Sequence, residues 1–149
     1  MKAIQEEFSC SVCNSRVHSI FKKLNITETE SLSEIKACSH YKKGQYIFSE
    51  NGNPLGLYCI NHGKVKLAAT GENGKEQILR LLKDGDVAGY RSLISGERYH
   101  CNAVALEDSS ICFIPKQCHS LRSSRQKHEV DCRCIGSSHS TYSSHLTIW

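Results

Sequence analysis

Between Gly44 and Lys116 the chain alternates short apolar segments with tight turns, and this pattern constrains the fold more than any other feature. Each segment has the length of a strand and is rich in β-branched, aromatic or aliphatic residues: QYIF, LGLYCI, KVKLAAT, EQILRLL, CNAVAL and SICFIP. The turns between them contain Gly, Asn or Asp, as in ENGNP, NHGK, GENGK and KDGD. No stretch of a dozen helix-forming residues separates consecutive segments, which argues against a parallel βαβ sheet. The pattern predicts an antiparallel β-sandwich or β-roll.

Two short helices are predicted ahead of the strands. The first covers residues 17–24, where apolar residues follow the i, i+3, i+4, i+7 spacing of one helix face: Val17, Ile20, Phe21 and Leu24. The second begins in TETESLSEIKAC, where Thr27 and Glu30 fit the capping-box pattern, and it ends before YKKGQ. Both helices should pack at the N-terminal side of the roll.

The composition limits the class of protein. A chain of 149 residues has the length of one domain plus extensions, and 39% hydrophobic with 23% charged residues is typical of a globular protein. No apolar run approaches the roughly 18 residues of a membrane span, and MKAIQEEFSC carries acidic residues where a secretory signal needs an apolar core. We therefore expect a cytoplasmic location with no membrane partner. The net charge of +4 is modest for a nucleic-acid-binding surface.

The order of segments from YKKGQYIF to SICFIPK resembles the effector domain of Crp/Fnr-type bacterial transcription regulators, over about residues 8–116. The resemblance implies a mainly β fold, an antiparallel double-stranded β-helix or jelly roll of the cyclic-nucleotide-binding type, with short N-terminal helices. It implies an effector-sensing role with a small-molecule effector and no enzymatic activity. We expect a Cys-containing extension and helix in residues 1–26, the roll in residues 27–117 and a separate tail in residues 118–149.

The tail does not continue this resemblance. In the family, a dimerisation helix and a winged helix-turn-helix follow the roll, whereas apolar residues in 118–149 are too widely spaced for such a helix. Ser becomes the commonest residue, which predicts a disordered polar tail, and a shifted reading frame would produce such an abrupt change. We expect that this chain does not bind specific DNA, which would require a full-length form with the winged helix. The family's homodimer should be weak.

The resemblance places an effector pocket in GDVAGYRSLISGERYHC. Its candidate residues are Gly89, Tyr90, Arg91, Arg98, His100 and Cys101. In members that bind cyclic AMP, a Glu shortly after the glycine bonds the ribose and an Arg pairs with the cyclic phosphate. Here Tyr90 follows Gly89, and either Arg98 or His100 stands at the Arg position, depending on the register. Cyclic AMP binding is therefore not expected. Alternatively, the stretch is only a loop and helical turn that closes the roll.

The cysteines suggest a possible metal site. Oxygen-sensing members of the family hold an iron–sulfur cluster through an N-terminal Cys group and one Cys on a late strand. Cys10, Cys13 and Cys112 fall at such positions, but a third N-terminal Cys is missing, with Ser19 in one plausible place. Three thiolates hold an iron–sulfur cluster poorly, and zinc normally takes four ligands.

Other interpretations remain open. One is a zinc- or thiol-based redox module that uses Cys10 and Cys13. Another is a cupin-like metalloenzyme, although no His-x-His sequence occurs in the chain. Without an export signal, the nine cysteines should be reduced, and we expect Cys38, Cys59 and Cys112 to pack as small hydrophobic residues.

Overall fold

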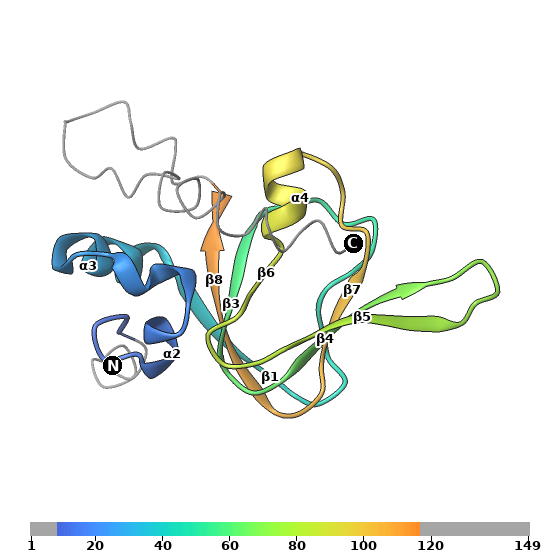
Figure 1. The fold of residues 1–149 in the computed structure, drawn as a ribbon, viewed down its shortest axis with the longest axis horizontal. Coiled ribbons are helices and arrows are strands. Elements are labelled where there is room, and N and C mark those ends of the chain that lie inside the picture. Colours follow the sequence, from blue (N-terminus) through green and yellow to red (C-terminus); the bar gives the residue numbers. More distant parts are fainter. Residues whose placement is uncertain (1–8, 117–149) are drawn as a thin grey trace.

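The strands form two four-stranded antiparallel sheets in a computed structural model that describes residues 9–116 (Figure 1). The first sheet has the order β1-β8-β3-β6, formed by Ala37–Tyr41, Ser109–Pro115, Gly56–His62 and Val87–Ala88. The second has the order β2-β7-β4-β5, formed by Tyr46–Phe48, Asn102–Ala105, Val65–Thr70 and Glu76–Leu82. This arrangement confirms the predicted jelly roll. The expectations about the tail, DNA binding and the dimerisation helix lie outside the described residues.

The main core lies between the two sheets. The first sheet contributes Ile60 and Ile111, and the second contributes Val65, Leu82 and Ala103, all with at most 1% of their surface exposed. Every second side chain of a strand points to the same face, so these residues meet in the interior of the roll. Burial of this apolar surface is the main force that holds the sheets together.

A second core covers the outer face of the first sheet. There Leu57, Val87 and Ile114 pack against Phe21 and Leu32 from the N-terminal segment. The first sheet is thus covered on both faces, which explains why GLYCI and SICFIP read as nearly continuous apolar runs. Figure 1 shows the N-terminal helices beside this sheet.

The N-terminal helices differ from the prediction. The predicted helix over residues 17–24 is divided into α2 (Asn14–Val17) and a 3₁₀ helix, η1 (Ile20–Lys23). The cause is Ser19, which has an extended backbone and accepts a hydrogen bond from the Phe21 N–H, so it caps a new helix. Serine favours such positions because its short side chain bonds the local backbone.

The next helix, α3 (Ile26–Ile35), begins two residues earlier than predicted. Its capping box is formed by Asn25 and Glu28, and Thr27 lies inside the helix. The helix ends at Ile35, before YKKGQ as predicted, but the last residues of TETESLSEIKAC do not belong to it. After Ile35 the backbone becomes extended at Lys36, and Ala37–Tyr41 pairs with β8 as an edge strand.

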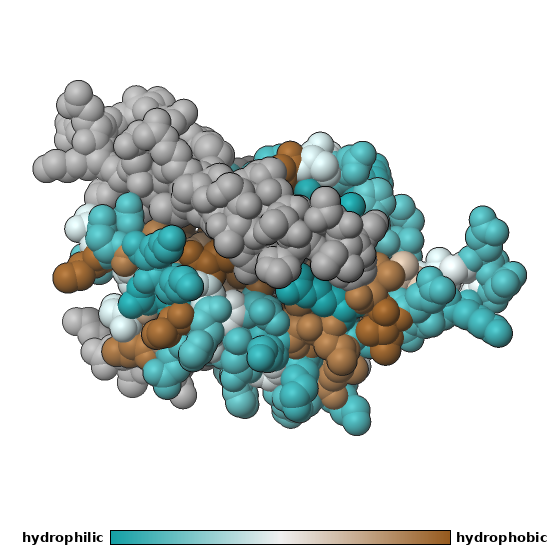
Figure 2. Space-filling view, in the orientation of Figure 1, coloured by the Kyte–Doolittle hydropathy of each residue, from teal (hydrophilic) through white to brown (hydrophobic). Residues whose placement is uncertain are grey.

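The hairpin of β4 and β5 projects from the roll (Figure 1). Ile78 and Leu81 of β5 are 58% and 61% exposed, and Figure 2 shows apolar surface at the base of this hairpin. Among residues 9–116, no helix is long and apolar enough to cross a membrane.

Candidate ligand-binding site

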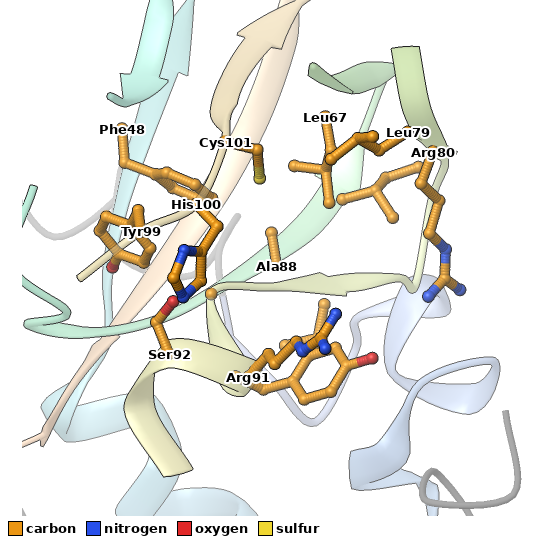
Figure 3. Close-up of a pocket in the computed structure, with 14 residues that line it drawn as sticks. Phe48, Leu67, Leu79, Arg80, Ala88, Arg91, Ser92, Tyr99, His100 and Cys101 are labelled. Atoms are coloured by element: carbon orange, nitrogen blue, oxygen red, sulfur yellow. The ribbon is translucent and has the colours of Figure 1, made fainter. Parts of the chain in front are cut away.

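A pocket of about 110 Å³ lies between β5, β6, α4 and the segment just before β7 (Figure 3). Helix α4 spans Tyr90–Ser95 and follows β6 directly. The wall is largely apolar and comprises Phe48, Leu67, Leu79, Leu82, Val87 and Ala88, with Tyr99. The rings of Phe48 and Tyr99 stack with their centroids 4.1 Å apart, which gives the pocket a rigid aromatic side.

Two glycines position α4 at this pocket. Gly89 caps its start with φ of 83°, and Gly96 caps its end with φ of 75°, a left-handed conformation that favours glycine. A Cβ at Gly89 would also lie 3.2 Å from the carbonyl O of Gly56. The tight turn therefore brings Arg91 and Ser92 to the pocket immediately after β6.

Of the predicted pocket residues, the structure brings five together. Gly89, Tyr90, Arg91, His100 and Cys101 line the pocket. Arg98 does not line it, because its Nη1 donates to the carbonyl O of Asn51 at 3.1 Å. The structure thus places His100, and not Arg98, on the pocket side, where its Nε2 is 3.1 Å from Glu97 Oε2.

Sequence reasoning missed Arg80, which also lines the pocket from β5. Arg80 is two residues before the buried Leu82, so both side chains point to the same face of β5. The spacing of two residues between Arg80 and Leu82 is the sequence signal that could have indicated Arg80 as a pocket residue. Leu79 lines the pocket as well. The pairing of β4 with β5 changes register beside Leu79, between Leu67 and Ala68 of β4, and this irregularity turns Leu79 toward the pocket.

The charge of the pocket is positive. Arg80 and Arg91 carry guanidinium groups, which remain charged at all physiological pH values, and no Asp or Glu occurs in the described lining. Burial raises the pKa of Tyr99 to about 12. Burial, followed by the Glu50 carboxylate, also raises the pKa of the Cys101 thiol. Both groups are therefore uncharged at neutral pH and act as apolar wall.

The predicted metal ligands lie on the other side of the roll. Cys112 forms a disulfide with Cys38, its direct partner across β1 and β8. The expectation that both thiols are reduced and pack as small hydrophobic residues is wrong for this pair. The physical reason is the strand register, which brings their Cα atoms within 4.0 Å.

The donor set does not fit an iron–sulfur cluster or zinc. The Cys112 sulfur in a disulfide is not a thiolate, and the Ser19 hydroxyl donates to the carbonyl O of Arg16. Within residues 9–116, no group of three or more His, Cys, Asp and Glu side chains is arranged to hold a metal ion. Cys10 is buried, and Cys13 donates from Sγ to Asn61 Oδ1 at 3.2 Å.

Comparisons with known proteins identify the class. The sequence profile of the cyclic nucleotide-binding domain matches residues 38–120, so the chain belongs to this family. It is similar to the fumarate and nitrate reduction regulatory protein of Vibrio cholerae, with 33% identity over 71% of this chain and 42% of that protein. It is also similar to the transcriptional activator protein Anr of Pseudomonas aeruginosa, with 30% identity over 71% of this chain and 43% of that protein.

Solved structures agree with this assignment at the level of the fold. The catabolite activator protein of Thermus thermophilus superposes with a TM-score of 0.66 and 23% identity, over 86% of this chain and 56% of that one. The sequence identity to the two regulators named above confirms the resemblance to Crp/Fnr-type regulators as homology. The chain spans less than half the length of the two regulators.

Proposed function

We propose that this chain is the effector-sensing domain of a Crp/Fnr-type transcription regulator, and that it is not an enzyme. The domain would comprise about residues 27–117, with the extension of residues 1–26 and its helices packed on it. DNA binding would belong to a form that carries a winged helix, acting as a homodimer in the cytoplasm. The family, the homologous regulators and the pocket support this proposal.

We further propose that the effector is a small, mainly apolar molecule with one acidic group, rather than cyclic AMP. The observation that carries this is the described lining of the pocket, which contains two guanidinium groups and no carboxylate. A ribose exposes hydroxyl donors, which bind best to a carboxylate acceptor. The cyclic AMP-binding members carry a Glu shortly after the glycine that corresponds to Gly89. In this chain the residue after Gly89 is Tyr90.

The size of the pocket supports the same choice. Its volume of about 110 Å³ lies well below the roughly 300–1,000 Å³ of sites for drug-sized ligands. A ring or a short aliphatic chain could occupy the apolar wall, while Arg91 of α4 or Arg80 of β5 pairs with a carboxylate. Figure 3 shows that these two side chains come from different elements, a helix and a strand, at the edge of the pocket.

The test is a thermal-shift titration of the full chain with benzoate, phenylacetate and hexanoate, and with benzyl alcohol as the uncharged analogue. At least one of the acids should raise the melting temperature more than the alcohol does. Ala88→Leu should abolish the shift, because Ala88 is 2% exposed and its side chain lies at the pocket. Ala69→Leu, a substitution in β4 outside the pocket lining, is the control and should keep the shift.

Two results would contradict the proposal. One is a shift of equal size in the parent chain and in Ala88→Leu, which would place binding elsewhere. The other is the absence of a shift with all three acids together with a clear shift with cyclic AMP.

A further inference from the structure

Three cysteines lie in one row across the first sheet. Cys112 in β8 is the direct partner of Cys38 in β1 and of Cys59 in β3. Residues directly opposite each other on neighbouring strands point to the same face, so the three side chains share one face of the sheet. Cys112 forms its disulfide with Cys38, and Cys59 remains a thiol on its other side.

The N-terminal segment brings further thiols to this face. Cys13 and Cys112 line the same open pocket of about 260 Å³, together with Lys36 and Asn61. Cys10 is buried in the outer core, against which Cys59 also packs. Cys112, although only 6% exposed, is therefore the half of the disulfide that borders this pocket, and the Cys13 thiol of the same chain borders it too.

The thiols near the disulfide differ in their ability to attack it. Burial, followed by the nearby Cys13 and Cys10, raises the pKa of Cys59 to about 12. Only the thiolate attacks a disulfide, so Cys59 is almost inert at neutral pH. Cys13 is half-buried and lines the open pocket beside Cys112. The geometry therefore favours Cys13 as the attacking residue.

We propose that this cluster of Cys13, Cys38 and Cys112 is a thiol–disulfide exchange site. The Cys13 thiolate attacks Cys112 Sγ, a Cys13–Cys112 bond forms, and the Cys38–Cys112 bond breaks. The electron pair of the broken bond leaves with Cys38 Sγ, which takes up the proton that Cys13 released. The number of disulfides is conserved, so the step needs no oxidant or reductant.

The exchange changes which parts of the fold are linked. Before it, the disulfide joins the edge strand β1 to β8. After it, the bond joins the segment before α2 to β8, and β1 loses its covalent link to the sheet. The site lies on the outer face of the first sheet, apart from the ligand pocket, and its chemistry is independent of the function proposed above.

The experiment uses the full chain with Cys118, Cys132 and Cys134 replaced by Ser, so that only the described cysteines exchange. The disulfide-containing protein is incubated without reductant, quenched with acid, alkylated and mapped by mass spectrometry of its disulfide-linked peptides. The parent should yield a Cys13–Cys112 peptide with Cys38 alkylated. The initial rate should rise with pH, because the thiolate is the attacking species.

Three variants test the assignment. Cys13→Ser should keep only the Cys38–Cys112 peptide, whereas Cys101→Ser, which alters a thiol away from this face, should give the map of the parent. Cys38→Ser, oxidised with diamide, should form the Cys13–Cys112 bond directly, which confirms the contact without relying on exchange. Circular dichroism checks that each variant is folded.

Two outcomes would overturn the proposal. The first is the absence of the Cys13–Cys112 peptide from both the parent and Cys38→Ser. The second is a Cys59–Cys112 peptide that forms at an undiminished rate in Cys13→Ser, which would assign the attack to Cys59.

Discussion

At the scale of single residues, Gly56 shows how closely β3 and β8 approach. A Cβ at this position would lie 2.7 Å from Cε2 of Phe113 and against the carbonyl O of Ile114. The Ile114 carbonyl belongs to the backbone of the paired strand, so it cannot move without disturbing the sheet. We predict that Gly56→Ala lowers the free energy of unfolding by about 2 kcal/mol. Urea unfolding followed by circular dichroism measures this change.

The control for that substitution is Gly71→Ala in the β4–β5 turn. There a Cβ would meet only the carbonyl O of Lys75, at 3.4 Å, which is an ordinary contact. Its effect should stay within about 0.5 kcal/mol, as for most surface substitutions. Equal effects of the two substitutions would argue against the close packing at Gly56.

Cys59 provides a second prediction at this scale. Its pKa rises from 9.0 to about 12 on folding, mainly because burial disfavours the thiolate. At pH 8, iodoacetamide should therefore alkylate Cys59 about a thousand times more slowly in the folded chain than in urea. Peptide mass spectrometry of timed samples measures both rates. A folded-state rate close to that in urea would show that folding does not raise the pKa of Cys59.

The same shift fixes the sign of a pH effect on stability. Folding raises the pKa of this acid, so the native state holds the proton more tightly than the unfolded chain does. The stabilisation is fully present below pH 9 and is lost as the pH rises toward 12. Cys59→Ala should therefore weaken the decrease in unfolding free energy between pH 9 and pH 12.

At the scale of elements, the start of α3 distinguishes two possible caps. The Asn25 side chain accepts from the Glu28 N–H at 2.9 Å, and Glu28 returns a bond to the Asn25 N–H at 3.0 Å. We predict that Asn25→Ala lowers the unfolding free energy by about 1 kcal/mol. Thr27→Ala removes an exposed side chain inside the helix and should have almost no effect. Thermal unfolding compares the two, and the reverse order would restore Thr27 as the cap.

Strands were easier to predict than helices in this chain. Gly, Asn and Asp in the turns bound the segments from Gly44 onward and predicted an antiparallel β-roll, and the resemblance to the Crp/Fnr effector domain added the jelly-roll order. β1 was missed because residues 37–41 are an edge strand with mostly exposed or half-buried side chains, so they show no clean apolar alternation. The helix over 17–24 was misplaced because one serine competes for the local backbone.

The site was predictable only where it is local in sequence. Gly89, Tyr90 and Arg91 lie in one turn and helix, so the stretch itself indicated them. Arg80 comes from another strand, and its place at the pocket depends on the pairing of β4 and β5. The Cys38–Cys112 disulfide likewise depends on the pairing register of two strands whose cysteines are 74 residues apart in the sequence. Composition carries no information about that register.

At the scale of the whole molecule, the two sheets separate two chemically different regions. The ligand pocket lies against the second sheet, with β6 and α4 closing it. The cysteine row lies on the outer face of the first sheet, beneath the N-terminal segment. β6 takes part in both, because Val87 packs in the outer core and Ala88 packs in the core between the sheets.

The central claim is that this cyclic nucleotide-binding domain senses an effector other than cyclic AMP, and calorimetry with cyclic AMP tests it most directly. The account predicts no measurable heat of binding up to millimolar nucleotide. In cyclic AMP-binding members an Arg pairs with the cyclic phosphate, whereas His100 lies on the pocket side here. The loss of that charge-assisted pair costs about 2–5 kcal/mol, which moves a micromolar dissociation constant toward the millimolar range or beyond it. A micromolar dissociation constant that rises at least about tenfold in Arg91→Ala, a cost of about 1.4 kcal/mol, would contradict the claim.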